Sequence, residues 1–172
     1  MKRFLAIVLS LSMLVGMAAC SNEKESADET TDVQVEGADE DPLAGVDTST
    51  VSGSIYASFV DEINKSDDIV AVAEILADES ISGYSCVVTE MPEGYFAGFD
   101  EDIIGFNKAV GFAPMIGSIP FVCYIFDVDD AKSFASSLET HADPRWNICT
   151  EADETLVKVV DDYVFFIMCP AE

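Results

Sequence analysis

Acid–base chemistry in this sequence would depend on a single imidazole. His141 is the only histidine among the 172 residues, so a serine or cysteine nucleophile would need it as its base. Ser136 and Ser137 share its expected helix, and no G-x-S-x-G nucleophile elbow occurs. His141 follows the last helical turn, where the helix dipole favours a cation. We therefore expect a structural role for His141 and assign no catalytic residue.

Thiol and metal chemistry would depend on the cysteines that follow Cys20, which are Cys86, Cys123, Cys149 and Cys169. They form no C-x-x-C pair and have no second histidine beside them, so neither a metal site nor a cofactor is expected. An even number of cysteines in an exported chain permits two disulfides. Three of the four lie in apolar, strand-like runs, where a free thiol behaves as a small hydrophobic group. The sequence leaves open whether these cysteines form disulfides or stay as free thiols.

Acidic clusters provide the next candidates. The stretch 127–130 (Asp-Val-Asp-Asp) suggests a calcium loop, but Ala131 and Leu138 stand where an EF-hand needs oxygen ligands. We interpret it as a strand end followed by a helix N-cap. The stretches 100–102 and 151–154 are read as solvated loops first and as weak cation sites second. Whether any of these clusters binds calcium stays open.

Carboxylate catalysis has no specific signal in the sequence. Glycosidases use two acidic side chains at a set separation, and residues 51–172 contain 23 acids. Some pair will meet that separation by chance. A surface hydrolase that uses an acidic pair is therefore kept as the alternative function.

Aromatic residues offer two contact candidates. Tyr95, Phe96, Phe99 and Phe106 would form either an aromatic ligand face or, as we expect, part of the core. The pair 145–146 (Arg-Trp) follows Pro144 and looks like an exposed cationic and aromatic loop. Arg145 and Trp146 are the predicted partner contact. In the alternative interpretation, Trp146 plugs the end of a helix and a sheet.

The N-terminus has the pattern of an export signal. Lys2 and Arg3 give it a positive start, and residues 4–19 are almost wholly apolar. That run is shorter than the about 20 apolar residues of a membrane-spanning helix. Two small residues, Ala18 and Ala19, come directly before Cys20.

This stretch resembles the signal peptide and lipobox of bacterial lipoproteins, although Met17 stands where leucine is commoner. The resemblance implies cleavage between Ala19 and Cys20 and a lipid on the Cys20 thiol. It implies an extracytoplasmic protein at the cell membrane, with the lipid bilayer as its partner through acylated Cys20. An ordinary secretory signal that is cut after Ala19 is the alternative.

Charge supports export and excludes one class of partner. Only Lys2 and Arg3 are charged before Cys20, so the rest of the chain keeps 6 basic and 33 acidic residues, a net charge of about −27. Such a charge repels nucleic acid, and no nucleic-acid partner is expected. Residues 20–50 are acidic and poor in large apolar side chains, so they are predicted to be a disordered linker.

Residues 51–172 are predicted to be a single α+β domain. Hydrophobic spacing indicates helices at 54–65 and 68–78, strands at 84–91 and 106–115, and the clearest strand at 119–128.

A further helix is expected from residue 129 to about residue 140, and then a hairpin of strands 156–160 and 163–169. With 161–162 as the turn, Lys158 lies opposite Phe165. A lysine suits an outer strand, whereas apolar residues on both faces place 119–128 and 163–169 inside the sheet.

The predicted fold is therefore N-terminal helices followed by a mostly antiparallel sheet with one helix packed on it and a C-terminal hairpin. This layout loosely resembles small uncharacterised lipoproteins of Gram-positive, anaerobe-type bacteria and implies no active-site residues. We expect a membrane-tethered, non-enzymatic module that binds a protein or cell-wall partner.

Overall fold

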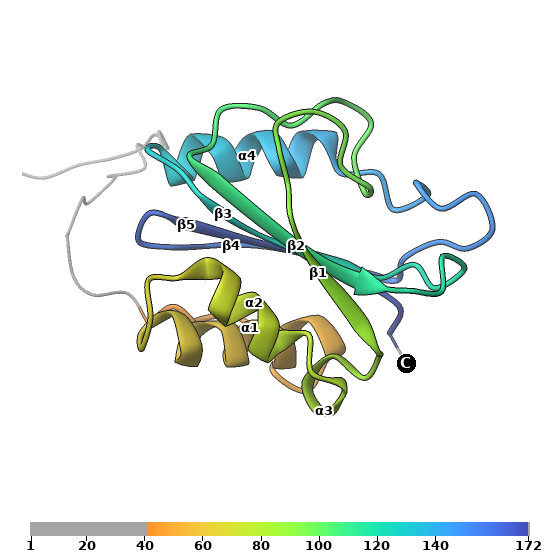
Figure 1. Cartoon of the computed structure of the whole chain (residues 1–172), viewed down its shortest axis with the longest axis horizontal. Helices are drawn as coiled ribbons and strands as arrows, with labels where there is room; N and C mark the ends of the chain where they lie inside the picture. Colours follow the sequence, from red (N-terminus) through yellow and green to blue (C-terminus); the bar gives the residue numbers. More distant parts are fainter. Residues whose placement is uncertain (1–40, 172) are drawn as a thin grey trace, which may run out of the picture. The chain divides into compact units, whose positions relative to one another are not determined.

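Two strands that are apolar on both faces occupy the middle of the sheet. The computed structural model describes residues 41–171 (Figure 1). In it, β3 (Val122–Asp127) and β5 (Tyr163–Cys169) pair antiparallel and consist almost wholly of buried residues. The strand order is β1-β2-β3-β5-β4. The predicted interior positions of both strands are confirmed.

The C-terminal hairpin has the predicted register. β4 (Glu154–Val160) pairs with β5 so that Lys158 lies opposite Phe165, and β4 forms one edge of the sheet. Asp161 in the turn has a φ of 52°. Aspartate tolerates this left-handed conformation better than branched residues do.

The other half of the sheet is formed by β1 (Cys86–Glu90) and β2 (Lys108–Pro114), both antiparallel to their neighbours. Gly111 in β2 lies beside the Tyr124 ring. A Cβ atom at residue 111 would come 2.5 Å from that ring. The glycine that interrupts this strand in the sequence therefore makes room for an aromatic side chain.

Helices lie on both sides of the sheet (Figure 1). α1 (Val51–Ile63), α2 (Ile69–Leu76) and the short α3 (Glu79–Ser82) lie on one side, and α4 (Ala131–His141) lies on the other. Each helix begins with a side chain that accepts a backbone N–H. These N-cap residues are Thr50, Asp68, Asp78 and Asp130.

Each side of the sheet has its own hydrophobic core. The first core joins α1 and α2 to the sheet through residues such as Phe59, Ile125 and Phe165. The second joins α4 and the segment that contains Phe96 to Phe126. These layers confirm the predicted α+β fold with helices first and α4 packed on an antiparallel sheet.

The packed part of the chain begins earlier than the sequence suggested. Leu43 and Val46 pack against the first core, and the Tyr56 hydroxyl donates to the Pro42 carbonyl at 2.9 Å. The expected linker boundary at Thr50 is therefore too late, because residues 41–50 belong to the folded part. The signal segment, Cys20 and the linker up to residue 40 lie outside the described residues.

Within residues 41–171, no helix is both long and apolar enough to cross a bilayer.

The packing of residues 41–50 predicts a measurable contribution to stability. In a chain that begins at Asp41, Leu43→Ser with Val46→Ser should lower the free energy of unfolding by about 1–3 kcal/mol, because two half-buried apolar side chains are lost. The thermal midpoint should fall by roughly 5–10 °C. The exposed change Thr48→Ser is the control and should change the midpoint by less than about 2 °C. Equal midpoints for all three chains would show that this segment does not pack.

Candidate functional site

Two loops that are distant in the sequence meet at one end of the sheet. One connects β2 to β3, and the other connects α4 to β4 (Figure 1). The Asn147 side-chain amide donates to the Gly117 carbonyl at 2.8 Å, and the Thr150 hydroxyl donates to the Ser118 carbonyl at 3.1 Å. We call residues 115–118 and 145–151 the loop tip.

The loop tip exposes large apolar side chains. Met115 is 79% exposed, Ile116 is 63% exposed and Ile148 is 99% exposed. Single exposed apolar residues are ordinary, but these three lie on two loops that are joined by hydrogen bonds, which makes the loop tip a candidate contact surface. A hollow of about 250 Å³ at the second loop is lined by Arg145 and by residues 147–151, which include Ile148.

The loop tip carries little net charge in a strongly acidic chain. Its two charged side chains form an ion pair, with Arg145 Nε 2.9 Å from Glu151 Oε2. Both are well exposed, so the pair contributes little to stability. It neutralises the tip and leaves the apolar side chains as its main feature.

Arg145 and Trp146, the predicted partner contact, lie in different environments. Arg145 faces solvent, whereas Trp146 is half-buried and packs against the second core. The indole nitrogen of Trp146 is buried and has no hydrogen-bond partner among the described residues. Trp146 therefore anchors the loop as the plug interpretation expects, and Arg145 is the exposed member of the pair.

Sequence reasoning did not identify the apolar residues of the loop tip. Residues 116–118 lie between the predicted strands 106–115 and 119–128, and Ile148 lies outside every predicted element. The available signal was the presence of isoleucine at residues 116 and 148, in segments that turns would normally fill with polar residues. That signal does not reveal that the two loops meet.

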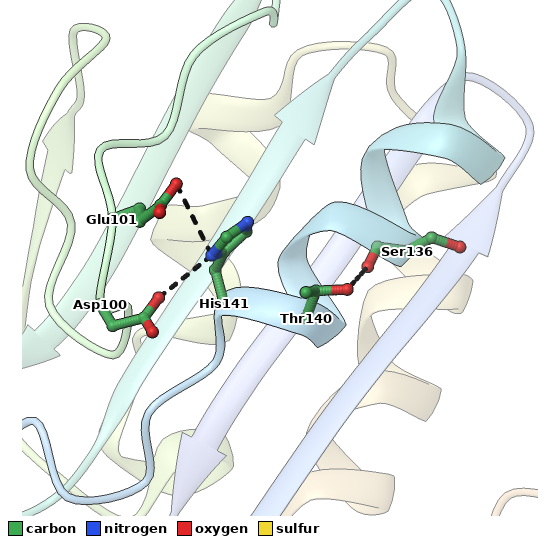
Figure 2. A network of polar contacts seen from close by, with 5 residues as sticks. All are labelled: Asp100, Glu101, Ser136, Thr140 and His141. Atoms are coloured by element: carbon green, nitrogen blue, oxygen red, sulfur yellow. Dashed lines mark hydrogen bonds and ion pairs between the residues drawn. The ribbon is translucent and has the colours of Figure 1, made fainter.

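His141 lies in a polar cluster on the α4 side of the sheet (Figure 2). Its Nδ1 atom is 3.1 Å from Asp100 Oδ1 and 3.8 Å from Glu101 Oε2, and both carboxylates are well exposed. Backbone hydrogen bonds hold the same loop against the helix end, from Asp100 N–H to the His141 carbonyl and from Asp143 N–H to the Gly98 carbonyl. The ring therefore bridges a loop and a helix terminus.

The His141 cluster contains no nucleophile in contact with the ring. Ser136 points away from His141 in Figure 2, and its carbonyl accepts the Thr140 hydroxyl at 2.8 Å. Ser137 and His141 line a small hollow of about 180 Å³, but no hydrogen bond joins them in the described structure. Residues 41–171 also contain no group of three or more histidine, cysteine or acidic residues that could hold a metal ion.

The cysteines are free thiols in two different environments. Cys86, Cys123 and Cys169 lie in or against the first core, and Cys149 is exposed on the loop tip. Burial, together with the Glu154 carboxylate, raises the pKa of Cys169 to about 12. Burial also raises the pKa of Cys123 well above its ordinary value. The buried thiols of Cys123 and Cys169 are therefore protonated at neutral pH. Cys86 is half-buried, and Cys149 is the exposed thiol among the described cysteines.

The acidic stretch 127–130 is held by ordinary contacts. Asp130 accepts the Ser133 N–H at 3.1 Å as the N-cap of α4. The Asn107 side-chain amide donates to Asp127 at 3.3 Å and to Asp129 at 3.0 Å. The strand-end and helix-cap interpretation therefore describes this segment.

The four aromatic residues of the second candidate contact serve mainly as core. Phe96 and Phe99 are buried, and Phe106 is half-buried against the second core. Tyr95 is the exception, because it is 70% exposed.

No protein-family model, no curated protein and no solved structure matches this chain.

Proposed function

We propose that this chain is a lipid-anchored, extracytoplasmic interaction module that contacts a protein partner through its loop tip. The observation that carries the proposal is the exposure of Met115, Ile116 and Ile148 on two loops held together by hydrogen bonds. Exposed apolar side chains in fixed positions lose unfavourable hydration when a partner covers them. The proposal assigns the tip to binding and assigns no reaction to the domain.

The anchor follows from the N-terminal sequence. Lys2 and Arg3, the apolar run and Ala18-Ala19-Cys20 support cleavage and lipidation at Cys20. Two acyl chains on one cysteine give stable membrane attachment, whereas one chain binds weakly. The anchor keeps the domain at the outer face of the cell membrane.

Charge favours a basic protein as the partner of the loop tip. A net charge of about −27 after Cys20 repels anionic lipid and other anionic surface polymers. A protein with an apolar socket and a basic rim would accept the tip and attract the acidic domain around it. We therefore infer a basic protein partner.

The acidic-pair hydrolase receives no support from the described residues. Such an enzyme needs two carboxyl groups in one cleft, at least one of them in a desolvated environment. The buried polar or charged residues of the described chain are Ser52 and Ser82, and no acidic residue is among them.

Lipidation at Cys20 can be tested by metabolic labelling. The full chain, expressed in a bacterium with a lipoprotein pathway and supplied with radiolabelled palmitate, should carry label, because the Cys20 thiol receives the acyl-bearing group. The variant Cys20→Ser should carry none and should leave the membrane fraction. Cys149→Ser is the matched control and should label like the parent chain. Label on Cys20→Ser would refute the anchor.

The loop tip can be tested by photo-crosslinking from matched isoleucine positions. A photoreactive amino acid at residue 148, in the lipidated protein on intact cells, should give a discrete protein adduct. The same amino acid at residue 104 should not, although Ile104 is also well exposed, at 65%. Met115→Ser with Ile116→Ser should lower the adduct yield about ten-fold, because two apolar contacts are lost.

Attraction between the acidic domain and a basic partner should make the crosslinking sensitive to salt. The yield of the residue 148 adduct should fall as salt is raised, since attraction to a basic rim is screened. Equal adducts from residues 104 and 148, or an adduct that persists unchanged in Met115→Ser with Ile116→Ser, would contradict the proposed contact.

A further inference from the structure

A second surface feature lies where the start of α1 meets the turn between α3 and β1. This groove has a volume of about 430 Å³. Its lining includes Ser49, Thr50, Val51, Ser54, Ile81 and Tyr84. We propose that the groove binds a neutral saccharide. This inference goes beyond the proposed protein contact and does not depend on it.

The groove has no charged side chain in its lining. Three other hollows in the described residues each include an acidic side chain, such as Glu151, Glu101 or Glu74. In a chain with 33 acidic residues, an uncharged hollow favours an uncharged ligand. No charged side chain lines the groove to pair with an ionic ligand, and an anion would also meet the negative field of the protein.

The polar groups of the groove match the hydroxyls of a sugar. Within the described structure, the side-chain hydroxyls of Ser54 and Tyr84 make no hydrogen bond, so both are free to donate and accept. The Ser49 hydroxyl donates to Asp47 Oδ1 at 2.6 Å, which leaves its oxygen as an acceptor. Sugar hydroxyls also donate and accept, so they can pair with each of these groups.

The apolar groups of the groove supply the other half of saccharide recognition. Val51 and Ile81 line the groove together with Tyr84. The Tyr84 ring packs edge-to-face on Phe121, with 5.3 Å between ring centroids. An aromatic ring that is held in place offers a surface for the C–H face of a sugar, while its hydroxyl remains available.

The turn at residues 82–84 is fixed by hydrogen bonds and leaves space for a ligand. The buried Ser82 hydroxyl donates to the Tyr84 carbonyl at 2.9 Å and accepts the Tyr84 N–H at 3.2 Å. Gly83 has a φ of 76°, and no atom lies within 4 Å of the position that a Cβ would occupy there. The groove is therefore already formed and needs little ordering on binding.

The proposal can be tested by NMR titration of the chain from residue 20 onward, carrying Cys20→Ser so that it stays soluble. The neutral probes are tri-N-acetylchitotriose and maltotriose, and the anionic comparison is trigalacturonic acid. Either neutral probe should cause saturable shifts at the amides of Ser54, Ile81 and Tyr84 at or below about 10 mM, the range of a weak complex. No saturable shift with either neutral probe, or equal binding of trigalacturonic acid, would overturn the proposal.

A double variant tests the placement of the ligand without disturbing the packing. Ser54→Ala with Tyr84→Phe removes two oxygen atoms and keeps the ring on Phe121. It should weaken binding of the neutral probe about ten-fold, as expected for two lost hydrogen bonds. Ser133→Ala with Tyr95→Phe removes the same atoms elsewhere on the surface and should leave binding unchanged. Unchanged affinity in the first variant would overturn the assignment.

The loop-tip variant separates this result from the proposed protein contact. Met115→Ser with Ile116→Ser should leave the saccharide-induced shifts as they are. If the tip proves to have no partner, saccharide binding at the groove is still expected. If saccharide binding fails, the crosslinking from residue 148 is unaffected.

Discussion

The antiparallel pairing of β3 with β5 is the contact on which both layers of the domain depend. Neighbouring residues on β5 serve opposite cores. Phe165 packs against Phe59 of α1 with 5.0 Å between ring centroids, and Phe166 packs against Phe99 with 4.4 Å. Because both side chains are fully buried, loss of either would remove a large apolar surface from one layer.

This strand pair also fixes the loops that carry the proposed contact. The β2–β3 loop leads directly into β3, and the α4–β4 loop leads into the strand that pairs with β5. Trp146 packs against the second core and so anchors the α4–β4 loop to the domain. Met115, Ile116 and Ile148 are therefore exposed on supported loops, which is the arrangement a preformed interface needs.

Local patterns were sufficient to predict the strands and the hairpin. The run 163–169 is apolar on both faces, and a two-residue turn at 161–162 determines which side chains oppose each other. Long-range contacts were not accessible in this way. Asn147 and Gly117 are joined by one hydrogen bond across 30 residues, and no spacing rule connects them.

Two features of the fold could not be predicted from the composition of the segments that form them. Residues 41–50 lie at the end of an acidic stretch, yet Leu43 and Val46, three residues apart, pack on the first core. The groove near Tyr84 was equally hidden, because its lining comes from two segments, at residues 49–54 and 81–84. Their proximity depends on how α1 and α3 pack together, which the sequence pattern does not specify.

If a partner covers the loop tip on the cell, it should shield Cys149, which is a native thiol on that tip. Its rate of reaction with a small water-soluble maleimide should be compared between the purified protein and intact cells. The reference is a thiol at residue 133, introduced as Ser133→Cys together with Cys149→Ser. Relative to that reference, Cys149 should react at least about five-fold more slowly on cells, as expected when most of the protein is bound. Equal slowing of both thiols would contradict the account.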